Sequence, residues 1–156
     1  MATTHRYRVT LAWSGSTGVG YQAYDRRHAG ATVPPSVAVA LSADPAFRGD
    51  TSGLNPEQLV VLAASSCQLL SFLAVAAKAR IDVVGYEDDA EGVMAEDDPP
   101  LRLVRIDLRP VITLAAPAAA GRVERLVGLA HDECYVANSL RTEIVVTPTV
   151  LTAPTA

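Results

Sequence analysis

The sequence predicts a single α+β domain over residues 1–156, built mainly from antiparallel strands around a long helix. Three observations support this fold class. Apolar and polar residues alternate with a period of two in the N-terminal third, a long segment without Gly or Pro follows, and strand-like segments flank a second helical pattern near the C-terminus. Few helices among many strands are typical of an α+β protein, whereas an α/β sheet alternates the two.

The N-terminal third is predicted to form a meander of three strands. Residues 7–13 place Tyr7, Val9, Leu11 and Trp13 on one face and polar residues on the other, as in a half-buried strand. After a turn, residues 19–24 are expected to form the second strand. Residues 36–41 follow the Pro34-Pro35 break and form the third.

Residues 57–80 are predicted to form a long helix. Asn55 suits the N-cap, Pro56 the first helical position and Glu57 the first turn. No Gly or Pro interrupts the segment before Arg80, so the helix extends for about 36 Å. Residues 59–77 carry no formal charge and are long enough to cross a bilayer. Their Ser, Cys and Gln residues favour a buried helix of a soluble protein instead, so no membrane is expected as a partner.

The second half of the chain predicts further strands and one more helix. Strand segments are expected at 81–86 and 91–94, separated by a solvated loop at 95–100 from a long strand over 104–114. That strand contains Pro110, which predicts an edge position or a bulge. After an Ala/Pro linker, an amphipathic helix and a last strand over 142–150 follow. The apolar stripe of the helix consists of Val123, Leu126, Val127, Ala130 and Cys134.

The composition excludes several classes of protein. With 49% hydrophobic and 19% charged residues and a mean hydropathy of +0.21, the chain is too apolar to be disordered. The apolar surplus predicts surface that is covered in an oligomer. A net charge of −4 argues against a nucleic-acid partner, which a basic surface would recognise. Residues 1–13 lack the apolar core of a secretory signal, so a reducing cytoplasm is the expected compartment.

Cys67 and Cys134 are the candidate reactive residues. Two cysteines are too few for a disulfide scaffold, so they are either a pair or two separate buried thiols that act as small hydrophobes. Both lie on helix faces expected to point inward, so they could meet across the core. A reactive cysteine must be a thiolate, and Cys67 is some three turns from the helix N-terminus, beyond its field. A cation is therefore required nearby; an Arg suits this role best, and a carboxylate could hold it in position.

A metal site is not predicted. His131, Cys134 and Cys67 supply three conceivable zinc ligands, whereas a structural zinc site takes four. No cofactor is expected.

Several short segments of the chain form a recognisable combination of motifs. They are 21–28 (YQAYDRRH), 42–44 (SAD), 47–50 (FRGD), 55–59 (NPEQL), 65–67 (SSC), 86–88 (YED), 130–134 (AHDEC) and 137–139 (ANS). Together they resemble the OsmC/Ohr family of osmotically inducible and organic-hydroperoxide-resistance proteins. The similarity extends from about residue 13 to residue 148, and the Y-x-x-Y-x-R-x-H segment resembles the broader OsmC-like branch more than the Gly-rich loop of typical Ohr members.

The resemblance implies an intertwined homodimer with sheets wrapped around long central helices and active sites at the dimer interface. It also implies roles for four residues: Cys67 as peroxidatic thiol, Cys134 as resolving thiol, Glu57 as the acid and Arg26 as the activating Arg. Arg27 is adjacent and remains an alternative to Arg26.

Helix geometry constrains this site. Positions 57 and 67 are ten residues apart, which is about 15 Å in a continuous helix. Either the helix breaks between them, or the Glu57 and Arg26 beside a given Cys67 come from a partner chain, and the second alternative is predicted.

The expected activity is reduction of organic hydroperoxides through a Cys67 sulfenic acid and a Cys67–Cys134 disulfide, which a thiol or dithiol then reduces. The alternative is a non-catalytic protein of the same fold that binds a small apolar ligand at the dimer interface.

Overall fold

The computed structural model describes residues 4–34, 36–97, 99–119 and 121–154. Pro35, Asp98 and Ala120, which fall in the turns and linker expected from the sequence, lie outside the described residues. The chain divides into two compact units, Met1–Leu59 and Val60–Ala156. The single domain of 1–156 stays a prediction.

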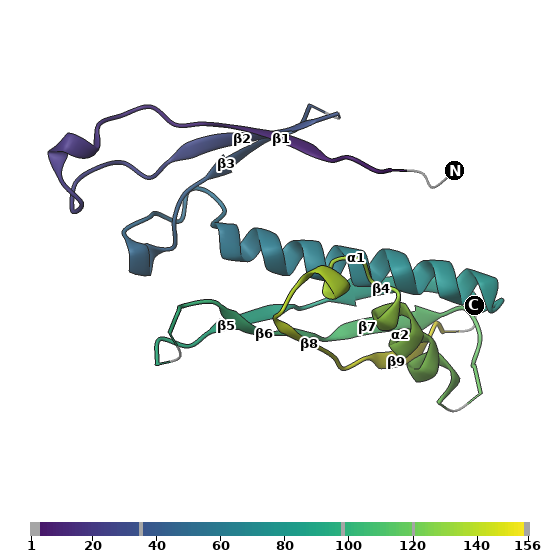
Figure 1. Ribbon diagram of the computed structural model, residues 1–156. Helices are drawn as coiled ribbons and strands as arrows, with labels where there is room; N and C mark the ends of the chain where they lie inside the picture. Colours follow the sequence, from purple (N-terminus) through teal and green to yellow (C-terminus); the bar gives the residue numbers. More distant parts are fainter. Residues whose placement is uncertain (1–3, 35, 98, 120, 155–156) are drawn as a thin grey trace. The chain divides into compact units, whose positions relative to one another are not determined.

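The first unit contains an antiparallel sheet of three strands in the order β1-β2-β3. These are β1 (Arg8–Ala12), β2 (His28–Val33) and β3 (Ala38–Leu41), shown in purple and blue in Figure 1. The predicted first and third strands are thereby confirmed. The apolar side chains of β1 are not half-buried as expected, since Val9 is 67% and Leu11 68% exposed.

The predicted strand over 19–24 is wrong. This segment contains the end of a short 3-10 helix, η1 (Thr17–Val19), and a turn in which the N–H groups of Ala23 and Tyr24 both donate to the Gly20 carbonyl. Strand pairing begins only at His28, so the second strand of the meander is β2. Apolar and polar residues alternate over 19–24 as in a strand. The local turn nevertheless forms the backbone hydrogen bonds that pairing with another strand would otherwise supply.

The segment before the long helix is a tight polar turn. The short 3-10 helix η2 (Pro45–Phe47) ends at Arg48, which has a left-handed φ of 65°. Gly49 then packs so closely against the backbone that a Cβ atom would lie 1.7 Å from the Ala43 carbonyl oxygen. Only glycine fits there.

Helix α1 (Pro56–Lys78) begins as the sequence predicts. The Asn55 side chain accepts a hydrogen bond from the Gln58 N–H at 2.7 Å, and the Gln58 side chain accepts one from the Asn55 N–H at 3.0 Å. This reciprocal capping satisfies two of the free N–H groups at the helix start. The helix is uninterrupted and ends at Lys78; Arg80, expected to be its last residue, has a left-handed φ of 58°.

The second unit contains two sheets of three strands, with the orders β4-β7-β9 and β5-β6-β8. Each combines one antiparallel pair with one parallel pair, because β8 pairs parallel to β6 and β9 parallel to β7. The strands are β4 (Val83–Asp88), β5 (Glu91–Met94), β6 (Leu103–Leu108), β7 (Pro110–Leu114), β8 (Glu143–Val146) and β9 (Thr149–Thr152).

The long strand expected over 104–114 is two strands. The chain passes from one sheet to the other at Arg109, and Pro110 begins β7, which lies in the middle of its sheet. The predicted edge position is therefore wrong, because a proline at the first residue of a strand need not donate to the ladder. The last strand, expected over 142–150, divides in the same way into β8 and β9.

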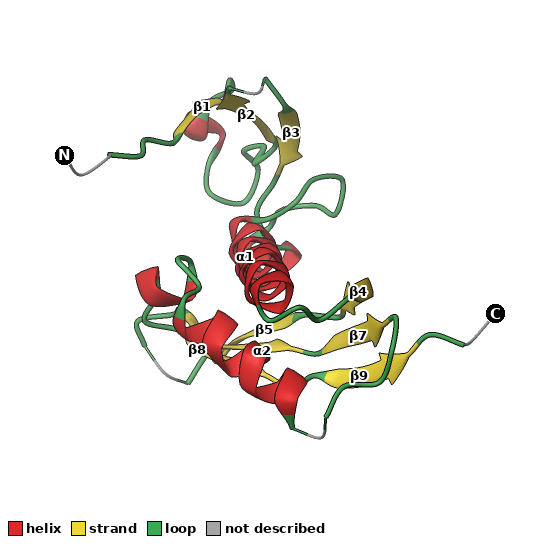
Figure 2. Cartoon of the chain, turned by 90° about the vertical axis from the view of Figure 1, so that its right-hand side faces the viewer, coloured by secondary structure: helices red, strands yellow, loops and turns green. Residues whose placement is uncertain are grey.

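Helices α1 and α2 (Arg122–Asp132) pack on one side of β4, β7 and β9, as Figure 2 shows. The stripe predicted for the second helix is confirmed, with Val123, Val127 and Ala130 in this core. Phe72 of α1 and Ile112 of β7 are fully buried beside them. A second core joins Ala64 of α1 to β6. The two cores fix the register of α1 on the sheets, and hence the position of Cys67.

Much of α1 remains uncovered. Leu62 and Leu70 are 59% and 64% exposed. Among the described residues, α1 is the one helix long and apolar enough to cross a membrane, and 28% of its most apolar window is buried. Length and composition alone do not separate a membrane span from the core helix of a soluble protein, and an apolar helix face of this kind also suits burial against a second chain.

Candidate active site

Cys67 and Cys134 are in contact in the second unit. Cys67 is half-buried on α1, Cys134 lies two residues beyond α2 with 1% exposure, and the Cys67 thiol lies close enough to act on the pKa of Cys134. Both are free cysteines. The sequence left open whether these two thiols meet, and the structure places them next to one another.

The turn after α2 holds Cys134 in place. The Asn138 side-chain amide donates to the carbonyl oxygens of Cys134, at 3.0 Å, and Asp132, at 2.8 Å. The backbone N–H of Asn138 donates to the same Cys134 carbonyl. These bonds close the chain around Cys134 and direct its sulfur toward α1.

Burial raises the pKa of the Cys134 thiol above its ordinary value, and the contact with Cys67 raises it further. The backbone N–H groups of Ala137 and Val136, which face the sulfur, act in the opposite direction but do not prevail. Cys134 is therefore a neutral thiol at neutral pH. The more accessible Cys67 is the sulfur that an external reagent meets first.

A groove of about 280 Å³ opens beside Cys67. Along α1 it is lined by Cys67, Leu70, Ser71, Ala74 and Lys78, and its other wall consists of Glu133 and Tyr135.

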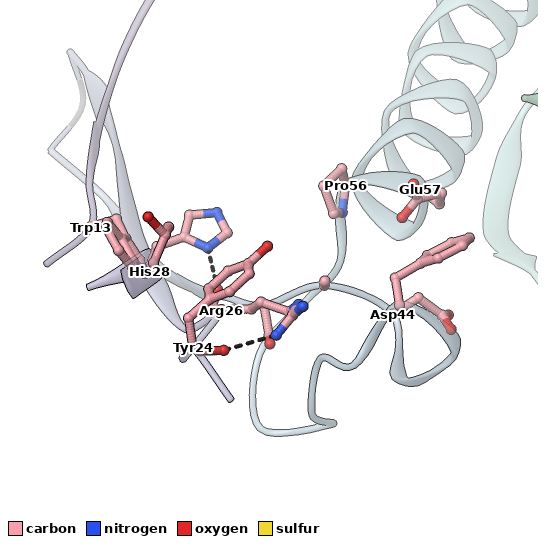
Figure 3. Close-up of a pocket in the computed structure, with 11 residues that line it drawn as sticks. Trp13, Tyr24, Arg26, His28, Asp44, Pro56 and Glu57 are labelled. Carbon is pink, nitrogen blue, oxygen red and sulfur yellow. Dashed lines mark hydrogen bonds between the residues drawn. The ribbon is translucent and has the colours of Figure 1, made fainter. Parts of the chain in front are cut away.

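Arg26 is held in the turn before β2 of the first unit. Its guanidinium donates to the carbonyl oxygens of Tyr24 and Tyr21, both at 2.8 Å. It also lies over the Tyr24 ring at 3.9 Å and the Tyr21 ring at 5.0 Å. The bond to Tyr24 is drawn in Figure 3, together with the contact between His28 Nδ1 and the Arg26 carbonyl. The turn therefore fixes the guanidinium without a carboxylate bound to it.

Arg27 is held differently. Its guanidinium binds the Asp25 carboxylate at 2.7 Å and lies 3.8 Å from that of Asp50. The hydrogen bonds from Arg27 lower the pKa of Asp25 to about 2. Two carboxylates thus neutralise Arg27.

Arg26 and Glu57 line one pocket of about 460 Å³ within the first unit (Figure 3). Trp13, Tyr24 and Phe47 supply its aromatic walls. Arg27 does not line it. The structure thus brings the predicted Arg and acid to one pocket, whereas Cys67 lines a different groove and Cys134 lines neither. Because α1 is unbroken between Glu57 and Cys67, the alternative of a helix break is excluded.

The family model for OsmC-like proteins matches residues 49–149. The chain belongs to the OsmC-like family. The resemblance drawn from the motifs is thereby confirmed, as is the α+β fold class. No curated protein matches this OsmC-like chain.

Solved structures share this fold. An OsmC-like protein of unknown function from Vibrio cholerae is 26% identical, with a TM-score of 0.84 over 94% of this chain and 100% of the other. An organic hydroperoxide resistance protein from Elizabethkingia anophelis is 19% identical, with a TM-score of 0.73 over 98% and 100%. A further one from Vibrio cholerae, solved with captopril in one of its active sites, is 20% identical with a TM-score of 0.67 over 96% and 94%.

Sequence reasoning missed two groups of residues around the thiols of this OsmC-like protein. Ser65, two positions before Cys67, donates to Asp88 on β4 at 2.5 Å, and nothing in the local sequence pairs these two residues. Lys78 lines the groove at i+11 from Cys67, a spacing that places it on the same helix face and that could have been noticed. No group of three His, Cys, Asp or Glu residues that could hold a metal ion occurs in the described part of the chain.

Proposed function

We propose that this OsmC-like protein is a thiol-dependent peroxidase that reduces organic hydroperoxides. The observation that carries the proposal is the contact between an accessible sulfur, Cys67, and a buried one, Cys134. A peroxidatic cysteine must meet its substrate, and a resolving cysteine must reach the oxidised sulfur without being oxidised first. The exposures of the two thiols match these roles.

The groups that exchange bonds and electrons in this reaction are the two sulfurs, the peroxide and a reductant. The Cys67 thiolate attacks one peroxide oxygen, the O–O bond breaks, and the organic part leaves as an alcohol after taking up a proton. The resulting Cys67 sulfenic acid condenses with the Cys134 thiol, which forms the disulfide and releases water. Two external thiols then restore both cysteines and leave as their own disulfide.

The activating Arg and its acid are proposed to come from a second chain, in a homodimer. Glu57 lies about 15 Å along the same unbroken helix from Cys67, too far for contact. The uncovered apolar face of α1 and the apolar composition support a second chain at this place.

Arg26 is preferred over Arg27 for activating the thiol. Arg26 shares a pocket with Glu57, and its guanidinium partners among the described residues are carbonyls and rings, so its charge is free to act on a thiolate. Arg27 is already neutralised by Asp25 and Asp50.

The pocket around Arg26 and Glu57 also favours organic over inorganic peroxides. Trp13, Tyr24 and Phe47 offer apolar contacts to an alkyl or aryl group, which hydrogen peroxide cannot use. Solved relatives named as organic hydroperoxide resistance proteins support this choice.

Counting free thiols tests the activity. One equivalent of cumene hydroperoxide should remove both thiols of the wild-type protein, because one turnover ends in a disulfide. Cys67→Ser should keep its single thiol, whereas Cys134→Ser should stop at a sulfenic acid that dimedone traps. If both wild-type thiols survive the peroxide, the protein is instead a non-catalytic member of the fold that binds a small apolar ligand.

Mixed dimers test the origin of Arg26. A Cys67→Ser chain and an Arg26→Ala chain, each nearly inactive, are co-expressed with different tags and purified as the heterodimer. A site shared between chains leaves one intact site per heterodimer, so about half of the wild-type activity should return. If each site belongs to one chain, every site carries a lesion and no activity returns.

A further inference from the structure

The side chain of Asn138 bridges the turn that carries Cys134. Helix α2 ends at Asp132, Cys134 follows in the turn, and the short 3-10 helix η3 (Ala137–Ser139) comes next. The Asn138 amide donates to the carbonyl oxygens of Asp132, at 2.8 Å, and Cys134, at 3.0 Å. The backbone N–H of Asn138 donates to the same Cys134 carbonyl at 3.0 Å. Asn138 thus ties the end of α2 to the backbone of the buried thiol.

The same turn is anchored to the core beside Cys67. The Val136 side chain packs against the buried cluster that includes Ala64, which lies on α1 three residues before Cys67. The backbone N–H groups of Val136 and Ala137 face the Cys134 sulfur. Because two donors hold the Cys134 carbonyl, the backbone at this position cannot turn freely, and the sulfur keeps its direction toward Cys67.

A fixed sulfur matters because Cys134 is a weak nucleophile. Burial raises the pKa of this thiol, so little thiolate is present at neutral pH. A poor nucleophile reacts fast only when it is held next to its target, which raises its effective concentration. The Cys67 sulfenic acid also stays open to a second hydroperoxide, because the first one reached the same sulfur. The position of Cys134 therefore decides which of the two reactions is faster.

We infer that Asn138 is a positioning residue that directs the Cys134 sulfur onto oxidised Cys67 and so protects Cys67 from overoxidation. The inference rests on the proposed function, because it needs a Cys67 sulfenic acid. In resolution, the Cys134 sulfur bonds to the Cys67 sulfur, the S–O bond breaks, and the hydroxyl group leaves as water with the thiol proton. In overoxidation, a second hydroperoxide transfers one oxygen to the sulfenic sulfur and leaves as an alcohol, which yields a sulfinic acid.

Variants within this turn separate positioning from folding. Asn138→Ala removes both side-chain bonds, and because Asn138 is exposed the core keeps its packing. Asn138→Asp keeps the size of the side chain but lacks the amide donor, so it repeats the test without a change of volume. Ser139→Ala is the matched control, because the hydroxyl of the exposed Ser139 donates to the Tyr135 carbonyl instead, at 2.6 Å.

The division of Cys67 between disulfide and sulfinic acid is measured by mass spectrometry over a series of cumene hydroperoxide concentrations. Asn138→Ala should reach half sulfinic acid at an about five- to tenfold lower concentration than the wild type, as the loss of one or two ordinary hydrogen bonds would allow. Asn138→Asp should change in the same direction, and Ser139→Ala should stay within about twofold of the wild type. In a Cys134→Ser background, dimedone should trap the sulfenic acid equally fast with and without Asn138→Ala.

A measurement without peroxide keeps this inference separate from the peroxidase proposal. Equilibration with dithiothreitol gives the effective concentration of Cys134 at Cys67, which should fall about fivefold in Asn138→Ala and change less than about twofold in Ser139→Ala. Wild-type values in both Asn138 variants would overturn the inference. An equal loss of sulfenic acid formation would also overturn it, because Asn138 would then support the fold as a whole. If the effective concentration falls as expected but hydroperoxide leaves wild-type Cys67 unoxidised, the peroxidase proposal fails instead.

Discussion

The hydrogen bond between Ser65 and Asp88 ties α1 to β4 two residues before Cys67, and Ser65→Ala tests how much it stabilises the fold. The Ser65 hydroxyl donates to one carboxylate oxygen of Asp88 at 2.5 Å, and the Arg109 N–H donates to the other at 2.7 Å. A hydrogen bond to a charged group contributes about 1.5–3 kcal/mol. Because Asp88 keeps its bond from Arg109 and both side chains are half-buried, we expect the lower end, about 1.5–2 kcal/mol.

Ser66→Ala is the matched control. Ser66 is the next residue of the same helix and is exposed, so its replacement changes the helix propensity equally, by about 0.5 kcal/mol in favour of alanine, without removing this bond. The difference between the two variants isolates the Ser65–Asp88 interaction.

Urea unfolding at one protein concentration measures this difference. With an m-value of about 2 kcal/mol/M, Ser65→Ala should unfold at a urea concentration lower than Ser66→Ala by about 0.8–1 M. A fixed concentration is required because association of chains would add to the apparent stability. If the two midpoints agree within about 0.2 M, the bond does not hold α1 to the sheet and the reasoning fails.

Three further predictions concern the thiols and the turn before α1. Because burial raises the pKa of Cys134, its alkylation by iodoacetamide in a Cys67→Ala background should be half-maximal above pH 9.0, and a midpoint at or below that value would contradict the assignment. The stabilisation linked to this neutral thiol is complete below pH 9.0 and is lost as the pH rises further. Arg26→Ala should slow alkylation of Cys67 at neutral pH about tenfold, through loss of a cation beside the thiolate, whereas Arg27→Ala should change it less than twofold; the reverse order would reassign the activating Arg. Gly49→Ala should destabilise the protein by about 3 kcal/mol or more, since its Cβ would overlap the Ala43 carbonyl; a thermal midpoint within about 2 °C of the wild type would show that this turn can move.

Local patterns predict the helices of this protein well because each helix is defined by neighbouring residues. At the start of α1, the side chains of Asn55 and Gln58 each accept a hydrogen bond from the backbone N–H of the other, and Pro56 is the first helical residue. The apolar stripe of Val123, Val127 and Ala130 follows from the helical period alone. Cys134, which was expected to continue the stripe of the second helix, lies two residues beyond α2 and is buried there.

The errors occur where the backbone hydrogen bonds differ from those that the alternation of side chains suggests. Residues 19–24 alternate as a strand does, but the Gly20 carbonyl and the Arg26 guanidinium satisfy their backbone groups locally. The segment 104–114 also alternates throughout, yet its two halves pair with different strands on either side of Arg109. Strand partners are set by packing between residues far apart in sequence, which a period of two does not encode.

Motifs, caps and periodicity are properties of short segments, so they suffice to predict the family, the α+β class and the unbroken helix that separates Glu57 from Cys67. The folded chain adds that the two thiols are neighbours, that Arg27 is neutralised while Arg26 shares a pocket with Glu57, and that Lys78 lines the groove at Cys67. Each of these features depends on how close two side chains lie that are far apart in the sequence. That distance is set by the packing of whole helices and strands and not by the local sequence.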